Sequence, residues 1–288
     1  MNLTNYKEIQ ALLFRHGFRF SKSLGQNFLV ADWVPRQIAE SAGLDEQTGV
    51  LEIGPGIGCL TAELGRRAGK VLSVEMDKTL KPILAETLEG HDNIEILFGD
   101  ILKQNIPVLV EEKLTGLRPV VCANLPYNVT TPVLTALIEP GCFDSITVMI
   151  QREVAKRICA APGTPDYGAF GIFVQWHTEP ELLFEVPPGC FMPQPKVTSA
   201  VIRLGRRETP PVAVKNEALL FRIIRAAFNQ RRKTLANALS SGLSISREEA
   251  EKAIAAAGLD PRVRGETLGI VAFATISDEL CGIISSDL

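Results

Sequence analysis

The strongest constraint on the fold is an alternation between short β-rich runs and helical stretches in the first half of the chain. Stretches with helical periodicity, such as residues 60–67 and 79–88, separate five apolar runs. The runs are VLEIG (50–54), VLSVEM (71–76), IEILFGD (94–100), PVVCANL (119–125) and ITVMIQ (146–151). Strands that alternate with helices form a mostly parallel sheet covered by helices. The sequence therefore predicts an α/β domain.

The pattern changes after Tyr167. Residues 169–177 predict a helix, and residues 181–204 predict two extended runs around a proline-rich connection, an antiparallel addition to the sheet. Beyond Gly205 apolar residues recur at spacings of three and four, and Ser246 stands three residues before Glu249 in the pattern of a capping box. We expect a sheet domain over residues 1–205 and a small helical domain over residues 206–288.

Composition excludes several classes of protein. With 288 residues, 46% apolar and 22% charged, the chain can bury a large core. Its first thirty residues hold no apolar stretch of signal-peptide or membrane length, which favours the cytoplasm. The six cysteines form no C-x-x-C pair and the three histidines are scattered, so we expect reduced thiols and no metal site. Nothing indicates a dimer helix, and we expect a monomer.

The distribution of charge is more informative than the net charge of −3. Between Arg203 and Lys233 there are nine basic residues and two acidic ones, a local charge of +7. Binding to nucleic-acid phosphates depends on local charge density, so this stretch suits such a partner. A solvated helix face explains the same charges. The candidate RNA-binding residues are Arg222, Arg225, Arg231, Arg232 and Lys233.

Three successive predicted strands end in a glycine turn or an acid. Gly54, Gly56 and Gly58 follow the first strand in a G-x-G-x-G pattern, where missing side chains let a ligand approach the backbone. Glu75 ends the second strand, where a carboxylate can accept hydrogen bonds from ribose hydroxyls, and Asp100 ends the third. The pattern predicts a site for a nucleoside-bearing cofactor. Nicotinamide dinucleotide and S-adenosylmethionine both remain open at this point.

The fourth strand ends in ANLPYN, residues 123–128. Methyl transfer to the exocyclic amine of adenine is difficult because the nitrogen lone pair is delocalised into the ring. Two preorganised acceptors directed at the amine protons favour the reaction; the Asn124 side-chain oxygen and the Leu125 carbonyl are candidates. Pro126 fixes the backbone, and Tyr127 offers a face on which an extruded base can stack.

Nine ordered sequence blocks resemble one known family over nearly the whole chain. The chain resembles the KsgA (RsmA) family of small-subunit ribosomal RNA adenine N6,N6-dimethyltransferases, which are related to the erythromycin-resistance methyltransferases. The blocks are SKSLGQNFL (21–29), LEIGPGIGCLT (51–61), VLSVEMD (71–77), GDIL (99–102), NLPYNVTTPVL (124–134), IQREVAKRI (150–158), DYGAFGIFVQ (166–175), FMPQPKVTSAVIRL (191–204) and FNQRRKTLANAL (228–239).

The resemblance implies a Rossmann-like class I methyltransferase sheet, S-adenosylmethionine as methyl donor, and a role in small-subunit biogenesis. The implied substrate is two adjacent adenosines near the 3′ end of the small-subunit rRNA within a pre-ribosomal 30S particle, each dimethylated on its amine. Implied cofactor contacts are Asn27, Leu29, Gly54, Gly56, Glu75, Asp100 and Asn124. Phe191 is expected to close over the base opposite Tyr127. In the segment after GQNFL the chain brings an acid, Asp32, later than family members often do.

Three other functions fit parts of the pattern. A large-subunit rRNA methyltransferase of the erythromycin-resistance type shares the fold and a similar Asn-x-Pro-aromatic signature. A DNA adenine methyltransferase is disfavoured because no segment is left for a base-reading domain. A non-catalytic ribosome-assembly factor on the same fold would be indicated by loss of the acceptor or cofactor residues, but Asn124, Tyr127, Glu75 and Asp100 are all present.

Overall fold

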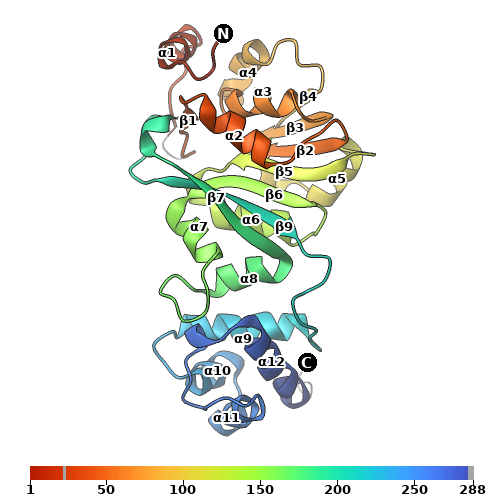
Figure 1. Ribbon diagram of the computed structural model, residues 1–288, viewed down its shortest axis with the longest axis vertical. Helices are drawn as coiled ribbons and strands as arrows, with labels where there is room; N and C mark the ends of the chain where they lie inside the picture. The colour runs from red at the N-terminus through yellow and green to blue at the C-terminus, as the bar shows by residue number, and fades with distance from the viewer. Residues whose placement is uncertain (22–23, 285–288) are drawn as a thin grey trace. The chain divides into compact units, whose positions relative to one another are not determined.

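The chain divides into two compact units in the structure, a computed structural model that describes residues 1–21 and 24–284 (Figure 1). Lys22 and Ser23, which belong to the first of the nine blocks, lie outside the described residues. The first unit comprises residues 1–155 and 178–206, and the second comprises residues 156–177 and the chain from residue 207 onward.

A seven-stranded sheet forms the centre of the first unit, with the order β4-β3-β2-β5-β6-β9-β7. β2, β3, β4, β5 and β6 pair in parallel, whereas β9 is antiparallel to both β6 and β7. Both the predicted parallel sheet and its antiparallel addition are confirmed. The strands are β2 (Thr48–Ile53), β3 (Lys70–Glu75), β4 (Ile94–Phe98), β5 (Arg118–Asn124), β6 (Ser145–Gln151), β7 (Thr178–Val186) and β9 (Ser199–Arg206).

The strand order reverses at β2. From β2 the chain adds β3 and β4 on one side and then returns to add β5 and β6 on the other. Leu51 accordingly pairs with both Leu72 of β3 and Val121 of β5. Open α/β sheets bind ligands outside the carboxyl ends of their strands at such a reversal. The fold therefore directs attention to the chain segments that follow β2 and β5.

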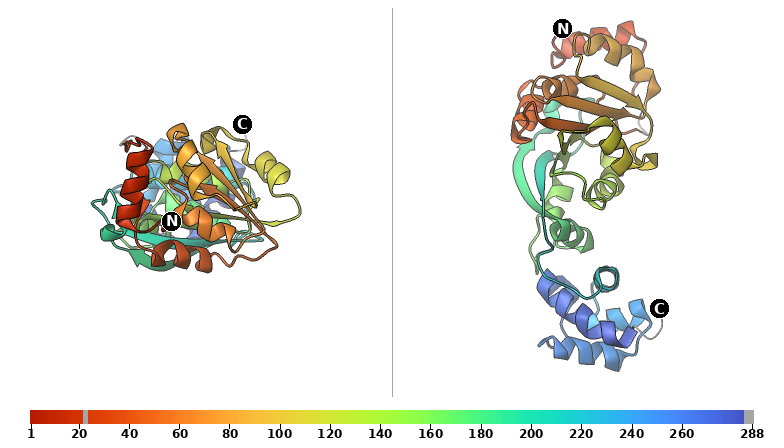
Figure 2. Two further views of the ribbon diagram at one scale, coloured as in Figure 1. Left: turned by 90° about the horizontal axis from the view of Figure 1, so that it is seen from above. Right: turned by 90° about the vertical axis from the view of Figure 1, so that its right-hand side faces the viewer.

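Helices cover both faces of this sheet (Figure 2). They are α2 (Trp33–Ser41), α3 (Cys59–Gly65), α4 (Lys81–Thr87), α5 (Ile106–Lys113) and α6 (Thr130–Ile138). α1 (Tyr6–Arg15) shares a buried cluster with α4, and α7 (Arg152–Ile158) crosses the boundary between the units. Short 3-10 turns are η1 (Lys78–Leu80), η2 (Ile101–Lys103), η3 (Tyr127–Val129) and η4 (Pro188–Cys190). A second, two-stranded sheet pairs β1 (Phe28–Leu29) with β8 (Phe191–Met192).

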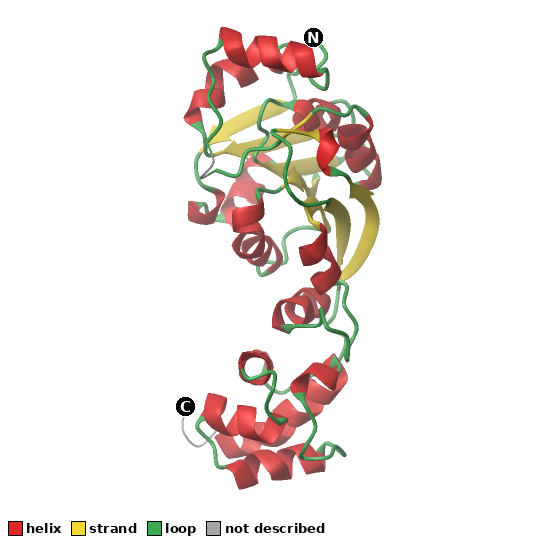
Figure 3. Ribbon diagram, turned by 90° about the vertical axis from the view of Figure 1, so that its left-hand side faces the viewer, coloured by secondary structure: helices red, strands yellow, loops and turns green. Residues whose placement is uncertain are grey.

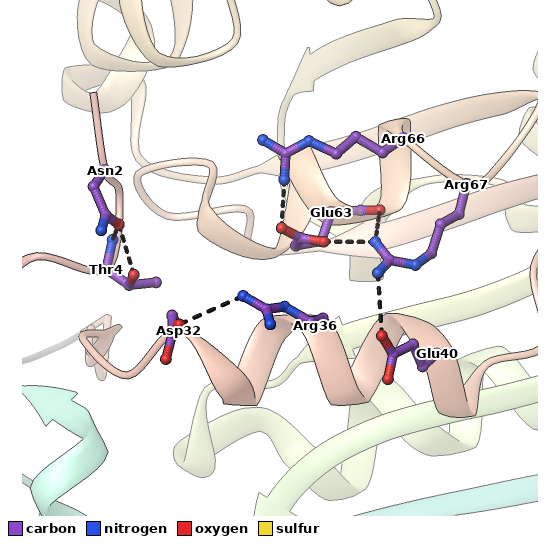
Figure 4. Close-up of polar contacts among 8 residues, drawn as sticks. All are labelled: Asn2, Thr4, Asp32, Arg36, Glu40, Glu63, Arg66 and Arg67. Atoms are coloured by element: carbon purple, nitrogen blue, oxygen red, sulfur yellow. Dashed lines mark hydrogen bonds and ion pairs between the residues drawn. The ribbon is translucent and has the colours of Figure 1, made fainter.

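An ion-pair network joins α2 to α3, the helix that follows the glycine turn (Figure 4). The Glu63 carboxylate accepts hydrogen bonds from Arg66 and, at 2.5 Å, from Arg67. The Arg67 guanidinium also lies 3.4 Å from Glu40 of α2. Isolated surface pairs stabilise a fold by at most about 1 kcal/mol. Apolar packing therefore holds these helices in place: Val34 and Ile38 of α2 share a buried cluster with strand residues. The ion pairs add a smaller contribution that orients α3 relative to α2.

In the described part of the second unit all regular elements are helical, and the strands belong to the first unit (Figure 3). The helices are α8 (Ala169–His177), α9 (Glu217–Asn229), α10 (Leu235–Leu243), α11 (Arg247–Ala256) and α12 (Ile270–Ile284), with the 3-10 turn η5 (Gly265–Thr267). The predicted capping box at Ser246 is confirmed at the start of α11. Buried Leu220, Leu239 and Phe273 belong to the core of this unit.

The division of the chain differs from the expected boundary at residue 205, because residues 156–177 group with the helical unit. Ile172 and Trp176 of α8 belong to the core of that unit. The Tyr167 hydroxyl donates a hydrogen bond of 3.0 Å to the Leu268 carbonyl. Packing, rather than position along the chain, determines which core a helix joins.

In the described ranges, no helix combines the length and apolar character needed to span a bilayer.

Candidate active site

A cavity of about 230 Å³ lies at the carboxyl ends of the parallel strands, entirely within the first unit. Its lining comes from the segment before β1 and from the segments that follow four parallel strands. The lining residues fall in the ranges 24–29, 52–57, 59–60, 74–76, 99–102 and 124–129, with Leu80 and Val133. Each of the three predicted strand-end features and the ANLPYN segment contributes to one cavity.

The glycine turn after β2 requires glycine at all three of its glycine positions. Gly54, Gly56 and Gly58 have φ angles of 70°, 58° and 88°, in the left-handed region that side chains disfavour. A Cβ on Gly56 would also lie 3.1 Å from the Phe28 ring. The absence of side chains here lets Phe28 of β1 approach the turn and leaves backbone exposed to the cavity.

Glu75 connects the end of β3 to the glycine turn. Its carboxylate accepts hydrogen bonds from the backbone N–H of Asp77 at 2.7 Å and from that of Gly56 at 3.3 Å. The residue is only 6% exposed, and burial raises the pKa of its carboxyl group. Two donors fix the carboxylate at the cavity, where its remaining lone pairs can accept bonds from ligand hydroxyls.

Asp100 and Asn27, two further expected cofactor contacts, also line the cavity. The Asp100 carboxylate accepts a hydrogen bond of 3.0 Å from the backbone N–H of Leu102, which fixes it at the start of η2. The Asn27 side chain donates to the Gly25 carbonyl at 2.9 Å. Leu29 follows in β1 and is 3% exposed. The structure thus brings together all the residues expected to contact a cofactor.

Two residues that were not predicted as site residues strengthen the site. Gln26 donates from its side-chain amide to the Asp77 carboxylate at 2.7 Å and so ties the segment before β1 to the end of β3. Glu52 lines the cavity, is 1% exposed and accepts a hydrogen bond of 2.5 Å from the Ser73 hydroxyl. Burial raises the pKa of Glu52 to about 7, and the hydrogen bond from Ser73 offsets only part of this effect. The sequence offered one indication for Glu52, because an acidic residue within an apolar strand is unusual.

The ANLPYN segment begins where β5 ends. The Asn124 amide donates to the Asn27 carbonyl at 3.5 Å, which turns its oxygen, Oδ1, away from Asn27. The Leu125 backbone N–H donates to the Met149 carbonyl at 3.1 Å and so attaches the segment to β6. Pro126 holds its φ at −59°. The expected acceptors, Asn124 Oδ1 and the Leu125 carbonyl, are consecutive on a backbone held by the sheet.

Tyr127 is half-buried at the start of η3 and lines the cavity. Its hydroxyl lies 2.7 Å from the Ser199 hydroxyl of β9, a contact that is not evident from the sequence. Burial raises the pKa of the Tyr127 phenol, so the hydroxyl is neutral at physiological pH. The aromatic ring therefore borders the cavity with its far end attached to the sheet.

Phe191, which the resemblance assigns to the opposite side of the base, is buried in the structure. It is 4% exposed, belongs to the buried cluster of α2 and α3, and is absent from the cavity lining. In β8 it pairs with Leu29 of β1, and the Val30 N–H donates to the Cys190 carbonyl at 2.8 Å. The observed role of Phe191 is thus to support the strand that carries Leu29. A sequence motif does not show toward which neighbours its aromatic side chain packs.

The basic candidates lie in the second unit. Arg222 and Arg225 belong to α9, and Arg232 and Lys233 are exposed in the turn that follows it. The Arg231 guanidinium is engaged by the Glu266 carboxylate and by the Thr164 carbonyl, the latter at 3.3 Å. Arg231 therefore has an internal structural role, whereas its neighbours are available to a polyanion.

The site combines what a nucleoside cofactor and a planar acceptor base require. Fixed carboxylates and exposed backbone line one part of the cavity, and two carbonyl-type acceptors beside an aromatic ring line another. Among residues 1–21 and 24–284, no group of three or more His, Cys, Asp or Glu side chains is arranged to hold a metal ion. The chemistry that the residues support is group transfer to an amine by orientation and hydrogen bonding.

Comparisons with known proteins agree with this geometry. A family model described as ribosomal RNA adenine dimethylase matches residues 17–280. The chain is 48% identical over 274 residues to ribosomal RNA small subunit methyltransferase A of Geobacillus thermodenitrificans, covering 93% of this chain and 94% of the relative. It is 47% identical over 286 residues to the protein of that name from Geobacillus kaustophilus, covering 96% and 98%.

Solved structures with the same fold include the 23S rRNA methyltransferase ErmE, with a TM-score of 0.68 and 28% identity over 88% of this chain and 99% of that chain. A dimethyladenosine transferase from Plasmodium falciparum has a TM-score of 0.71 and 24% identity, covering 86% of this chain and 95% of that chain. The predicted Rossmann-like sheet is confirmed by both likenesses.

The raised pKa of Glu52 predicts a pH-dependent stability. Between pH 4.5 and about 7 the folded protein keeps this proton while the unfolded chain releases it, so stability falls as the pH rises through that window. Glu52→Gln lacks the titrating group. We expect its free energy of unfolding, relative to wild type, to rise by up to about 3 kcal/mol between pH 4.5 and pH 8.

Urea unfolding of both proteins without added ligands at several pH values measures this difference. Exposed Glu181→Gln, which makes the same chemical change at the surface, is the matched control. A constant difference for Glu52→Gln across the window would show that Glu52 titrates normally.

Proposed function

The chain belongs to the ribosomal RNA adenine dimethylase family, and we propose that it transfers methyl groups from S-adenosylmethionine to two adjacent adenosines near the 3′ end of small-subunit rRNA. The observation that carries the proposal is the placement of Asn124, Leu125 and Tyr127 on the same cavity as Glu75. The small subunit is favoured over the large one because curated relatives named for it are 45–48% identical over nearly the whole chain, whereas ErmE is 28% identical.

The residues of the cavity fit S-adenosylmethionine. Glu75 would accept hydrogen bonds from the ribose hydroxyls, and Asp100 one from the adenine amine. Gly54 and Gly56 expose backbone, and Asn27 and Leu29 cover the cavity from the segment around β1; Asn124 completes the proposed contacts. When bound, the cofactor supplies a methyl group on a positively charged sulfur. The chain itself needs only to place the amine in line with that methyl group.

Asn124 and Leu125 would prepare the adenine amine. Asn124 Oδ1 and the Leu125 carbonyl would each accept a bond from one amine proton, which favours a pyramidal nitrogen with a more available lone pair. The same two oxygens stabilise the positive charge that develops on nitrogen. Because the Asn124 amide is held by Asn27 and Leu125 by Met149, little reorganisation is required. The amine proton is released to solvent after transfer.

Tyr127 would hold the target base outside the RNA stack. Stacking of a base on an aromatic ring contributes about 1–3 kcal/mol and offsets part of the cost of extruding the nucleotide. Phe191, the residue proposed for the other side of the base, is buried in β8 beside Leu29 of β1.

The second unit would contact rRNA phosphates. Arg225, Arg232 and Lys233 are exposed and Arg222 is half-buried, and they belong to the stretch with a local charge of +7. Phosphate contacts orient an enzyme on RNA without reading sequence. We propose that the partner is a pre-ribosomal 30S particle bound by a monomer in the cytoplasm.

Labelled S-adenosylmethionine and undermethylated small subunits test the proposal directly. We expect label on two adjacent adenosines near the 3′ end of the small-subunit rRNA. Asn124→Ala should lower the single-turnover rate by about 10²–10³, the loss typical of one preorganised polar group at a reacting centre. Particle binding should be retained.

Label on large-subunit rRNA would contradict the proposal and would indicate an activity of the erythromycin-resistance type. Particle binding without any methylation by the wild type would leave an assembly factor as the function. Asn124→Ala at wild-type rate would remove the acceptor role of that residue.

A second prediction concerns the cofactor. Glu75→Ala should weaken S-adenosylmethionine binding by about 1.5–3 kcal/mol, the range for hydrogen bonds to a charged group. Calorimetry measures the affinity, and exposed Glu181→Ala is the control. An unchanged affinity, or tight NAD binding by the wild type, would contradict the assignment of this cavity.

A third prediction concerns the basic residues. Replacing Arg232 and Lys233 with alanine should weaken particle binding and lower the slope of log affinity against log salt by about 1.4–1.8 units, since each phosphate contact contributes roughly 0.7–0.9. Arg247→Ala/Lys252→Ala removes the same charge from α11, where both side chains are ion-paired, and is the matched control. Equal slopes for wild type and the Arg232/Lys233 variant would indicate a solvated surface.

A further inference from the structure

Ser199 is a buried residue at the first position of β9, beside the last residue of β6. Its backbone is paired on both sides, with Gln151 of β6 and with Val186 of β7. Its side chain is 0% exposed. Immediately before it, the Thr198 carbonyl accepts a hydrogen bond of 3.0 Å from the Arg152 N–H. The Ser199 hydroxyl therefore has a fixed position relative to the sheet.

Tyr127 is attached to this hydroxyl from a different kind of segment. It lies in η3, a 3-10 turn of three residues, and its Oη is 2.7 Å from Ser199 Oγ. The turn itself is held at its backbone, where Thr130 Oγ1 donates to the Pro126 carbonyl at 3.2 Å. The long axis of the aromatic ring is thus attached at both ends, at the turn and at β9.

We propose that Ser199 is a positioning residue for the target base, holding the Tyr127 ring at the angle at which an extruded adenine stacks. The proposal rests on the proposed function, which assigns the ring as the stacking surface. A ring attached only through its Cα can pivot about χ1 and carry the stacked base with it. Small displacements of reacting atoms cost large factors in rate, so a tilted ring slows transfer.

A merely structural role for the hydroxyl pair would have different consequences. Buried polar groups are normally paired, and loss of a partner lowers the stability of the fold. Such a loss changes the melting temperature and does not act selectively on methyl transfer. A positioning role instead lowers the transfer rate at saturating substrates, while the affinities for cofactor and particle stay the same.

The test is a double-mutant cycle with Ser199→Ala, Tyr127→Phe and the double variant. Single-turnover methyl transfer is measured at saturating S-adenosylmethionine and saturating undermethylated small subunits. We expect each single change to lower the transfer rate by about 3–10-fold, which corresponds to the net free energy of one hydrogen bond. The double variant should have the same rate as the single variants, because both changes remove the same hydrogen bond. Ser145→Ala, at the other end of β6, removes a buried hydroxyl that has no hydrogen-bond partner in the described residues, and should keep the wild-type rate.

A stacking readout accompanies the rates. RNA with 2-aminopurine at the target position reports stacking through quenched fluorescence, and both single variants should recover part of the fluorescence on binding. Melting temperature and S-adenosylmethionine affinity are measured for every variant. If Ser199→Ala fails to fold, Tyr127→Phe decides alone, because it deletes the same bond without touching the buried serine.

Several results would overturn the inference. If Ser199→Ala folds, they are a wild-type transfer rate for this variant, a loss of rate in Tyr127→Phe that Ser199→Ala does not share, or losses that multiply in the double variant. If Ser199→Ala does not fold, a wild-type transfer rate for Tyr127→Phe overturns it. An active wild type with any of these outcomes leaves the proposed function intact. A wild type that methylates nothing overturns the proposed function, and this inference with it.

Discussion

The structure depends on the parallel pairing of β2 with both β3 and β5. Because β2 is the strand at which the order reverses, the segments that leave β2 and β5 diverge to opposite faces and open a crevice between them. The glycine turn enters this crevice from one side and the ANLPYN segment from the other. In the proposed function, the cofactor and the acceptor amine meet in this crevice. The sheet supplies the orientation that the chemistry needs.

Buried carboxylates at this edge show how the site is maintained. Glu75 accepts hydrogen bonds from two backbone N–H groups, one of them that of Asp77, and the Asp77 carboxylate accepts one from the Gln26 amide. Glu75 is therefore tied through Asp77 to the segment that covers the cavity. Glu52 lies deeper and has one short bond to Ser73. Burial raises the pKa of both Glu75 and Glu52 because the charged form loses hydration. The protein thus keeps destabilised acids where a polar ligand can compensate them.

The two units have separate cores and contain different parts of the proposed function. The first unit contains every residue of the cavity, and the second contains the exposed basic residues after α9. Arg231 shows the difference between sequence charge and available charge, since Glu266 already engages its guanidinium. The basic stretch thus contains both a residue in an internal ion pair and residues with exposed side chains. Which of its residues are ion-paired depends on an acid far along the chain, Glu266, and the local sequence does not show this.

Local patterns in the chain were enough to predict the α/β class, the five parallel strands, the strand-end acids and the ANLPYN segment, because strand periodicity and glycine turns are local properties. Only the tertiary structure placed Phe191 in the core beside Leu29, assigned α8 to the helical unit, and joined Tyr127 to Ser199. These contacts link residues far apart in the chain. They depend on which face of an element is buried and on which neighbour fills the space, and a local pattern carries neither.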